Sequence, residues 1–199
     1  FCKALLICFF AVVIVGGCSA FGVISGIIAS APSIEDIDAT PTGYLTTVLD
    51  NQGNQTATLV ASGSNRKYVT INEIPINLQH AFVAIEDERF YDHNGIDLQG
   101  IRAGLKGVAS GFHFSEGAST ITQQLLKNTV FTQWTSEQSM ADKFERKFQE
   151  QYLALQLEKV VDKDWILENY LNAINLGQNT LGVGVASERY FGKDVSELT

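Results

Sequence analysis

The sequence predicts a mainly α-helical protein, with one transmembrane helix at its N-terminus and a small β element before the helical body. A long uncharged stretch, from Ala4 to Ala29, opens the chain. From residue 75 onward, apolar residues recur at the spacing of three and four that is typical of helices. The sequence shows neither an internal repeat nor the alternation of strands and helices that would indicate a parallel sheet.

The uncharged stretch is long enough to cross a bilayer. As a helix it would reach about 39 Å, more than the roughly 30 Å of a hydrocarbon core. A cleaved signal peptide is one alternative, but its apolar region is normally shorter. A lipoprotein is another, because the run 15–18 resembles a lipoprotein cleavage box that ends at Cys18. The apolar stretch continues well beyond Cys18, so we expect residues 1–30 to be a retained anchor.

Charge and cysteine content limit the remaining possibilities. Lys3 is the only charged residue before Glu35, and the acidic residues that follow predict a single-pass cell-membrane protein whose body is extracytoplasmic. The net charge of −8 argues against nucleic acid as a partner. All three cysteines lie in or beside the anchor, which excludes a disulfide framework or a thiolate metal site in the body, and no metal site is predicted there.

Residues 31–75 are predicted to be a linker with short β-strands. Residues 44–49 are rich in β-formers, and a turn signal follows at 50–53. Residues 56–60 and 68–71 could supply partner strands. We see no chemistry in this segment.

Five helices are predicted in the body. Asp97 is a plausible N-cap for the second helix, and Thr120 with Gln123 fits a capping box at the start of the third. An apolar loop over 108–114 would separate these two helices. The expected helices cover 75–89, 98–108, a stretch from 119 or 120 onward, 136–160 and 164–174.

Carboxylates and aromatic residues gather over 86–95, at the end of the first predicted helix. Such a run is usually a solvated surface, but here aromatic side chains interrupt it. Glu86 and Phe90 are four residues apart, so a continuing helix would set the carboxylate beside an aromatic wall, which suits a general base. His93 stands in a tight turn, where a histidine is more often a structural hydrogen bonder than an acid or base.

Polar residues mark the start of the third helix. A glycine-containing loop that enters a helix N-terminus can bind an anion through free N–H groups and the helix dipole. Thr120, Gln123, Gln124 and Lys127 fall at spacings of three and four, on one face. An ordinary amphipathic helix would have a polar face as well. An inward-facing glutamine pair, however, needs partners that sugar hydroxyls and phosphate oxygens would supply.

A third polar cluster lies on the long helix. Arg146 and Glu150 are four residues apart and could be an ordinary surface ion pair. Alternatively, Arg146 and Lys147 bind phosphate while Glu150 faces the same cleft. Taken alone, this cluster leaves both interpretations open.

Together these clusters resemble one family. Residues 81–193 resemble the glycosyltransferase domain of class A penicillin-binding proteins and monofunctional peptidoglycan glycosyltransferases. Two departures are visible: Ala118 stands where the family usually has glycine, and residues 187–189 replace smaller ones. The matching runs, in order, are at 86–95, 119–128, 146–150, 166–172 and 190–193.

The resemblance implies a lysozyme-like helical domain over 76–199, with a second lobe that dips into the membrane and includes Phe112 and Phe114. It implies the polymerisation of lipid II with inversion at the anomeric carbon and release of polyprenyl pyrophosphate. A transpeptidase domain could follow Thr199. The implied partners are lipid II, polyprenyl-pyrophosphate-linked glycan, the membrane, cell-wall synthesis or division proteins, and moenomycin-type inhibitors.

The resemblance also implies a role for each matching residue. Glu86 corresponds to the general base, and Glu150 to a second carboxylate that assists the departing pyrophosphate, with or without a divalent cation (Mg²⁺ or Mn²⁺). Lys127, Arg146 and Lys147 would stabilise the charge of that pyrophosphate. The other residues expected at the substrate site are Asp87, Phe90, His93, Ser119, Thr120, Gln123, Gln124 and Asn128.

Two other functions compete with this one. A lytic transglycosylase or lysozyme-like hydrolase also uses a glutamate in a helical domain, but hydrolysis does not call for a basic cluster. A catalytically silent scaffold would not need both glutamates. The preferred hypothesis requires that Glu86 and Glu150 face one region and that the basic side chains converge there.

Overall fold

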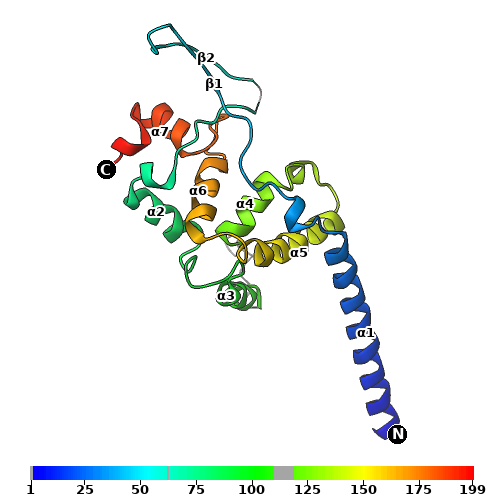
Figure 1. Cartoon of the computed structure of the whole chain (residues 1–199). Coiled ribbons are helices and arrows are strands. Elements are labelled where there is room, and N and C mark those ends of the chain that lie inside the picture. Colours follow the sequence, from blue (N-terminus) through cyan, green and yellow to red (C-terminus); the bar gives the residue numbers. More distant parts are fainter. Residues whose placement is uncertain (1, 62, 110–118) are drawn as a thin grey trace.

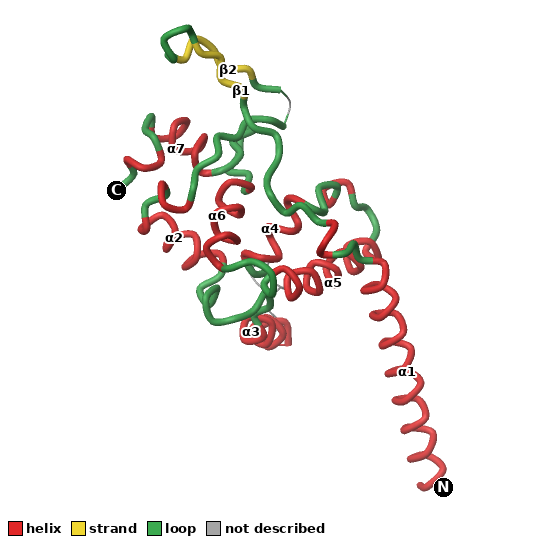
Figure 2. The backbone as a smooth tube through the Cα atoms, viewed as in Figure 1, coloured by secondary structure: helices red, strands yellow, loops and turns green. Residues whose placement is uncertain are grey.

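Helices form most of the chain, and the strands among its described residues form one hairpin (Figures 1 and 2). The computed structural model describes residues 2–61, 63–109 and 119–199, so most of the predicted apolar loop, and Ala118, lie outside it. The predicted mainly α architecture is confirmed. The elements are α1 (Cys2–Ser30), β1 (Thr46–Leu49), β2 (Gln55–Leu59), α2 (Ile76–Glu86), α3 (Leu98–Ala109), α4 (Ile121–Thr129), α5 (Met140–Leu157), α6 (Lys163–Ala173) and α7 (Val183–Phe191), with short 3₁₀ helices η1 (Ile34–Asp36), η2 (Ile71–Glu73), η4 (Trp134–Ser136) and η5 (Val195–Glu197).

Helix α1 projects from the body as one long rod (Figure 1). It is the one helix among the described residues that is long and apolar enough to cross a membrane. Its C-terminal end is fixed to α5. The Gln149 side-chain amide donates to the Ile27 carbonyl (3.3 Å) and to Ser30 Oγ (3.1 Å), and Ser30 Oγ donates to Glu145 (3.2 Å). The anchor therefore meets the body at α5.

Strands β1 and β2 form an exposed antiparallel hairpin. The predicted turn between them is confirmed. Asp50 Oδ1 accepts the N–H groups of Gln52 and Asn54, both at 2.8 Å, and Gly53 adopts a φ of +86° that favours glycine. The hairpin points away from the helical body, at the opposite side from α1 (Figure 1).

The third predicted strand, over 68–71, is wrong. The Val69 N–H donates to the side-chain oxygen of Asn172 (2.9 Å), and the Asn172 amide donates back to the Val69 carbonyl (2.8 Å). One side chain thus satisfies the backbone groups that a neighbouring strand would have paired. The segment is held on α6 instead of in a sheet.

The core lies where α4 packs against α5 and α6. Its completely buried residues include Leu125, Leu153 and Leu167, one from each helix. Segment 31–75, predicted to be a linker, also contributes core residues, namely Ala39, Val69 and Ile74. This segment is therefore packed onto the helical body.

Helix boundaries differ from the prediction where capping was not recognised. Helix α5 begins at Met140 instead of residue 136, because Ser139 Oγ accepts the Asp142 N–H (3.1 Å) and the preceding residues form η4. Helix α2 ends at Glu86 instead of Arg89, because Asp87 leaves the helical conformation. Helix α7 was not predicted.

Candidate active site

The end of α2 and the start of α4 bring together the polar runs at 86–95 and 119–128. Asp87 follows α2 directly, and its Oδ2 accepts the Ile121 N–H (2.9 Å), one of the free donors at the N-terminus of α4. The His93 Nε2–H donates to both oxygens of the same carboxylate, at 2.9 and 3.0 Å. Both side chains are buried. Asp87 and His93 therefore join the loop after α2 to α4 beneath the surface.

Gly95 fixes the same loop from the other side. Its carbonyl accepts Thr120 Oγ1 (2.8 Å) and the Gln123 amide (3.3 Å). Thr120 also caps α4 through the Gln123 N–H (3.2 Å), but the Gln123 side chain turns to Gly95, so only half of the predicted capping box forms. Gly95 has a φ of +86°, and a Cβ there would lie 2.6 Å from the Ala154 backbone.

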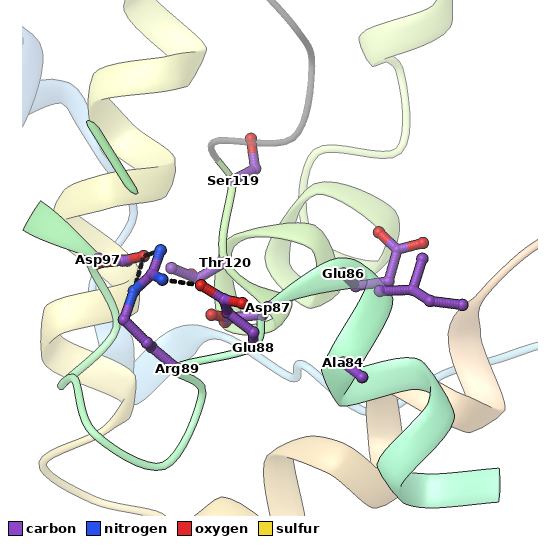
Figure 3. Close-up of a pocket in the computed structure, with 9 residues that line it drawn as sticks. Ala84, Glu86, Asp87, Glu88, Arg89, Asp97, Ser119 and Thr120 are labelled. Atoms are coloured by element: carbon purple, nitrogen blue, oxygen red, sulfur yellow. Dashed lines mark hydrogen bonds and ion pairs between the residues drawn. The ribbon is translucent and has the colours of Figure 1, made fainter. Parts of the chain in front are cut away.

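A polar cavity of about 220 Å³ opens where these segments meet (Figure 3). The side chains of Glu86 and Ser119 extend to the same side of it in Figure 3. Arg89 also lines the cavity, and its Nη2 lies 2.7 Å from Asp97 Oδ2. The hydrogen bond from Arg89 holds the pKa of Asp97 below its ordinary value, so that pair stays ionised. The cavity is lined by residues 84–89, Asp97, Ser119 and Thr120.

Helix α5 supplies a second group of charges beside α4. Glu150 has no exposed surface; its Oε1 contacts Arg146 Nη1 and its Oε2 lies 3.0 Å from Lys147 Nζ. Arg146 Nε also donates to both oxygens of Glu137, at 2.8 and 3.0 Å. Burial would lower the pKa of Arg146, but the hydrogen bond to Glu137 and the charge of Glu150 outweigh it, so the pKa is raised.

Hydrogen bonds that share Ser119 link the two glutamates. The Gln124 amide donates to Glu86 Oε2 (3.0 Å) and to the Ser119 carbonyl (3.4 Å). Lys147 Nζ then donates to Ser119 Oγ (2.6 Å) and pairs with Glu150. Glu150 itself does not line the cavity. The structure thus links Glu86 to Glu150 through Gln124 on α4, Ser119 just before α4 and Lys147 on α5.

Other predicted site residues lie apart from this network. Lys127 is on a later turn of α4, with its Nζ 4.4 Å from the ring centre of Trp134, and Asn128 beside it is half-buried. Phe90 is 0% exposed and has Lys163 Nζ over its ring, so it has no free surface for a substrate. Gln123 is also buried. Phe90 and Gln123 therefore support the site instead of lining it.

Glu137 was not predicted as a site residue. It lies nine residues before Arg146, outside any helical spacing, and the two meet only because the intervening chain folds back. In the sequence, Glu137 looks like any solvent-exposed acidic residue in a connection between helices, so no pattern distinguished it.

The residues around Glu150 do not fit a divalent cation. Mg²⁺ and Mn²⁺ prefer several oxygen ligands, and both Glu150 oxygens already contact cationic side chains. Within the described residues, no group of three His, Cys, Asp or Glu side chains gathers to hold a metal ion.

Comparison with known proteins identifies the family. A family model described as Transglycosylase matches residues 52–199, which includes all the residues of the network. The chain belongs to the transglycosylase family. The predicted class of enzyme, a transglycosylase domain of the penicillin-binding protein type, is confirmed.

Penicillin-binding proteins are relatives of this transglycosylase domain. It is 46% identical over 177 residues to penicillin-binding protein 1A of Clostridium perfringens (strain 13 / Type A), covering 86% of this chain and 25% of that protein. It is 38% identical over 195 residues to penicillin-binding protein 1A/1B of Bacillus subtilis (strain 168), covering 98% of this chain and 20% of that protein. The transglycosylase domain thus spans a fifth to a quarter of the length of these relatives.

Proposed function

We propose that the chain is a peptidoglycan glycosyltransferase that polymerises lipid II, anchored by α1 with its body on the extracytoplasmic side. The network that joins Glu86 to Glu150 carries this proposal. It supplies what the reaction needs: one carboxylate at a cavity and, a short distance away, two cations for a diphosphate.

Glu86 acts as the general base. It takes the proton from the C4 hydroxyl of an incoming lipid II sugar while that oxygen attacks the anomeric carbon of the growing glycan. A C4–O–C1 bond forms, the bond from C1 to the diphosphate oxygen breaks, and its electron pair leaves with the polyprenyl diphosphate. Attack opposite the leaving group inverts the anomeric carbon. The hydrogen bond from Gln124 fixes the orientation of the carboxylate for this transfer.

Arg146 and Lys147 stabilise the leaving diphosphate. Their charges are held in place before the substrate arrives, because Glu150 contacts both of them. Fixed charge of this kind is usually the largest contribution to catalysis, since no reorganisation is needed during the reaction. Glu150 is buried, so its effect on the leaving group passes through the two cations. A moenomycin-type phosphoglycolipid would compete for the same cations.

Helix α1 brings the enzyme to its substrates. Both donor and acceptor carry lipid tails and remain in the bilayer. A tether to the same membrane raises their effective concentration at the site.

The test is polymerisation of lipid II by the membrane-embedded chain and its Glu86→Gln variant. We expect wild type to form glycan and Glu86→Gln to lose at least about 100-fold in rate while folding normally, because general base catalysis contributes roughly 10²–10⁴-fold. Asp92→Asn, an exposed carboxylate on the same loop, is the matched control and should retain activity. Unchanged polymer yield in Glu86→Gln, or cleavage of finished glycan by wild type, would contradict the proposal.

A further inference from the structure

The connection between α4 and α5 turns every third side chain inward. From residue 131 to residue 139 the chain is exposed except at Phe131, Trp134 and Glu137. The spacing of three matches the 3₁₀ helix η4 in this connection, because side chains three apart share a face of such a helix. One side of a short surface segment is therefore directed at the body.

Each inward side chain has a different contact. Phe131 packs against the core. The Trp134 ring lies 4.4 Å from Lys127 Nζ, and Glu137 accepts Arg146 Nε. Phe131 thus anchors the segment, and the other two hold cationic side chains that the family resemblance assigns to the diphosphate.

Arg146 lies between two carboxylates. Its Nε faces Glu137 and its Nη1 faces Glu150, so the planar guanidinium is fixed from two directions. Little of this cluster is open to water: Arg146 is 14% exposed, Glu137 16% and Glu150 0%. Charge-assisted hydrogen bonds in such surroundings hold geometry more firmly than surface pairs do.

Lys147, which is 39% exposed, joins this cluster through Glu150 and makes it formally neutral. Arg146 and Lys147 balance Glu137 and Glu150. Loss of the Glu137 charge would leave one net positive charge where a diphosphate binds. Stronger binding of the diphosphate in the ground state, or after release from the glycan, does not speed the reaction.

We propose that Glu137 is a positioning residue that orients Arg146 toward the departing diphosphate and tempers the charge of the cluster. This inference rests on the proposed function. It has two measurable consequences in opposite directions: loss of Glu137 lowers turnover and strengthens diphosphate binding.

The experiment compares wild type with Glu137→Gln, using the whole chain in lipid bilayers. It measures kcat and KM for lipid II, and inhibition by added polyprenyl diphosphate. We expect kcat to fall about tenfold, because a hydrogen bond to a charged group loses its charge. The KM should not rise, and the inhibition constant of the diphosphate should fall several-fold. A residue that only stabilises the fold would lower the active fraction and leave KM and the inhibition constant unchanged.

Asp142→Asn is the matched control. Asp142 is exposed on α5, one turn before Arg146, and the substitution removes the same charge. We expect no change in kcat or in inhibition. An equal shift in Asp142→Asn would overturn the inference, since the effect would then follow net charge and not the Glu137 contact. The inference would also be overturned if wild type is active and Glu137→Gln has the same kcat and the same inhibition constant. Failure of wild type to use lipid II would instead overturn the proposed function.

Discussion

Gln123 and Gln124 are neighbours on α4, yet their side chains do different things. Gln123 is buried and donates to the Gly95 carbonyl. Gln124 donates to Glu86 and accepts Tyr170 Oη (3.4 Å). Burial, with the charge of Glu86, raises the pKa of Tyr170, so its hydroxyl stays protonated and can donate. That contact turns the Gln124 amide nitrogen toward Glu86.

Gln124→Met should therefore reduce catalysis more than stability. A hydrogen bond to a charged group is worth about 1.5–3 kcal/mol, so kcat should fall roughly 10- to 100-fold if the bond orients the base. Gln123→Met should show the reverse: a lower unfolding temperature with near-normal kcat per folded molecule. Thermal unfolding and lipid II kinetics on both variants check this pair. Equal loss of kcat in the two would show that neither glutamine has a separate task.

The sequence identified this glutamine pair but could not divide its tasks. Both residues fall on one predicted polar face, and the difference depends on contacts with Gly95 and Tyr170, which are distant in sequence. Glu137 was missed for the same reason. Helical spacing could place residues such as Gln123 and Gln124 on one face, and the family resemblance supplied their expected roles, whereas contacts between residues distant in sequence could not be predicted.

At the scale of elements, the loop from Asp87 to Asp97 positions α4. Asp87 binds the helix N-terminus, and the Gly95 carbonyl binds its first turn. Gly95 lies so close to α5 that no side chain fits between the two backbones. The packing of this loop against both α4 and α5 therefore depends on a glycine at position 95.

Gly95→Ala should destabilise the fold by roughly 2–5 kcal/mol, the sum of a strained positive φ and an overpacked contact. Chemical denaturation in detergent measures the change. Gly53→Ala is an informative control, because its φ is similar but a Cβ there meets nothing within 4 Å. If Gly95→Ala were no more destabilising than Gly53→Ala, the contact with α5 would carry no weight.

Several predicted elements match the structure closely, although the longest helix of the body, α5, is shorter at both ends than its predicted range 136–160. The anchor, α3 and α6 lie within a few residues of their expected bounds. The strand at 68–71 failed because Asn172 takes the place of a partner strand. Helix α7 was missed because it is short and follows Gly182, which offers no capping side chain.

At the scale of the whole molecule, the segment before α2 is tied to the C-terminal part of the chain. Lys67 contacts Glu188 on α7 and lies 2.8 Å from Asp194. The hydrogen bond from Lys67, together with those from Ser196, lowers the pKa of Asp194 to about 2. A depressed carboxyl pKa means that this contact contributes stability above the unfolded pKa near 4 and loses it as the pH falls through about 2.

Asp194→Asn should thus destabilise the protein above pH 4, by no more than about 1 kcal/mol because the pair is partly exposed. The difference from wild type should shrink steadily as the pH falls from 4 toward 2. Denaturant midpoints of both proteins across pH 2–6 measure it. A difference that stays constant with pH would contradict the assigned pKa.

The hydrogen bonds between the end of α1 and α5 limit how the body can move relative to the anchor. Gln149 holds the end of the anchor within one turn of Arg146 and Glu150 on the same helix. If α1 spans the bilayer, this contact fixes the distance of Arg146 and Glu150 from the lipid headgroups. A flexible linker between α1 and the body would let that distance vary. A pyrophosphate whose tail stays in the bilayer would then reach its cations by sliding sideways, without being lifted out of the membrane.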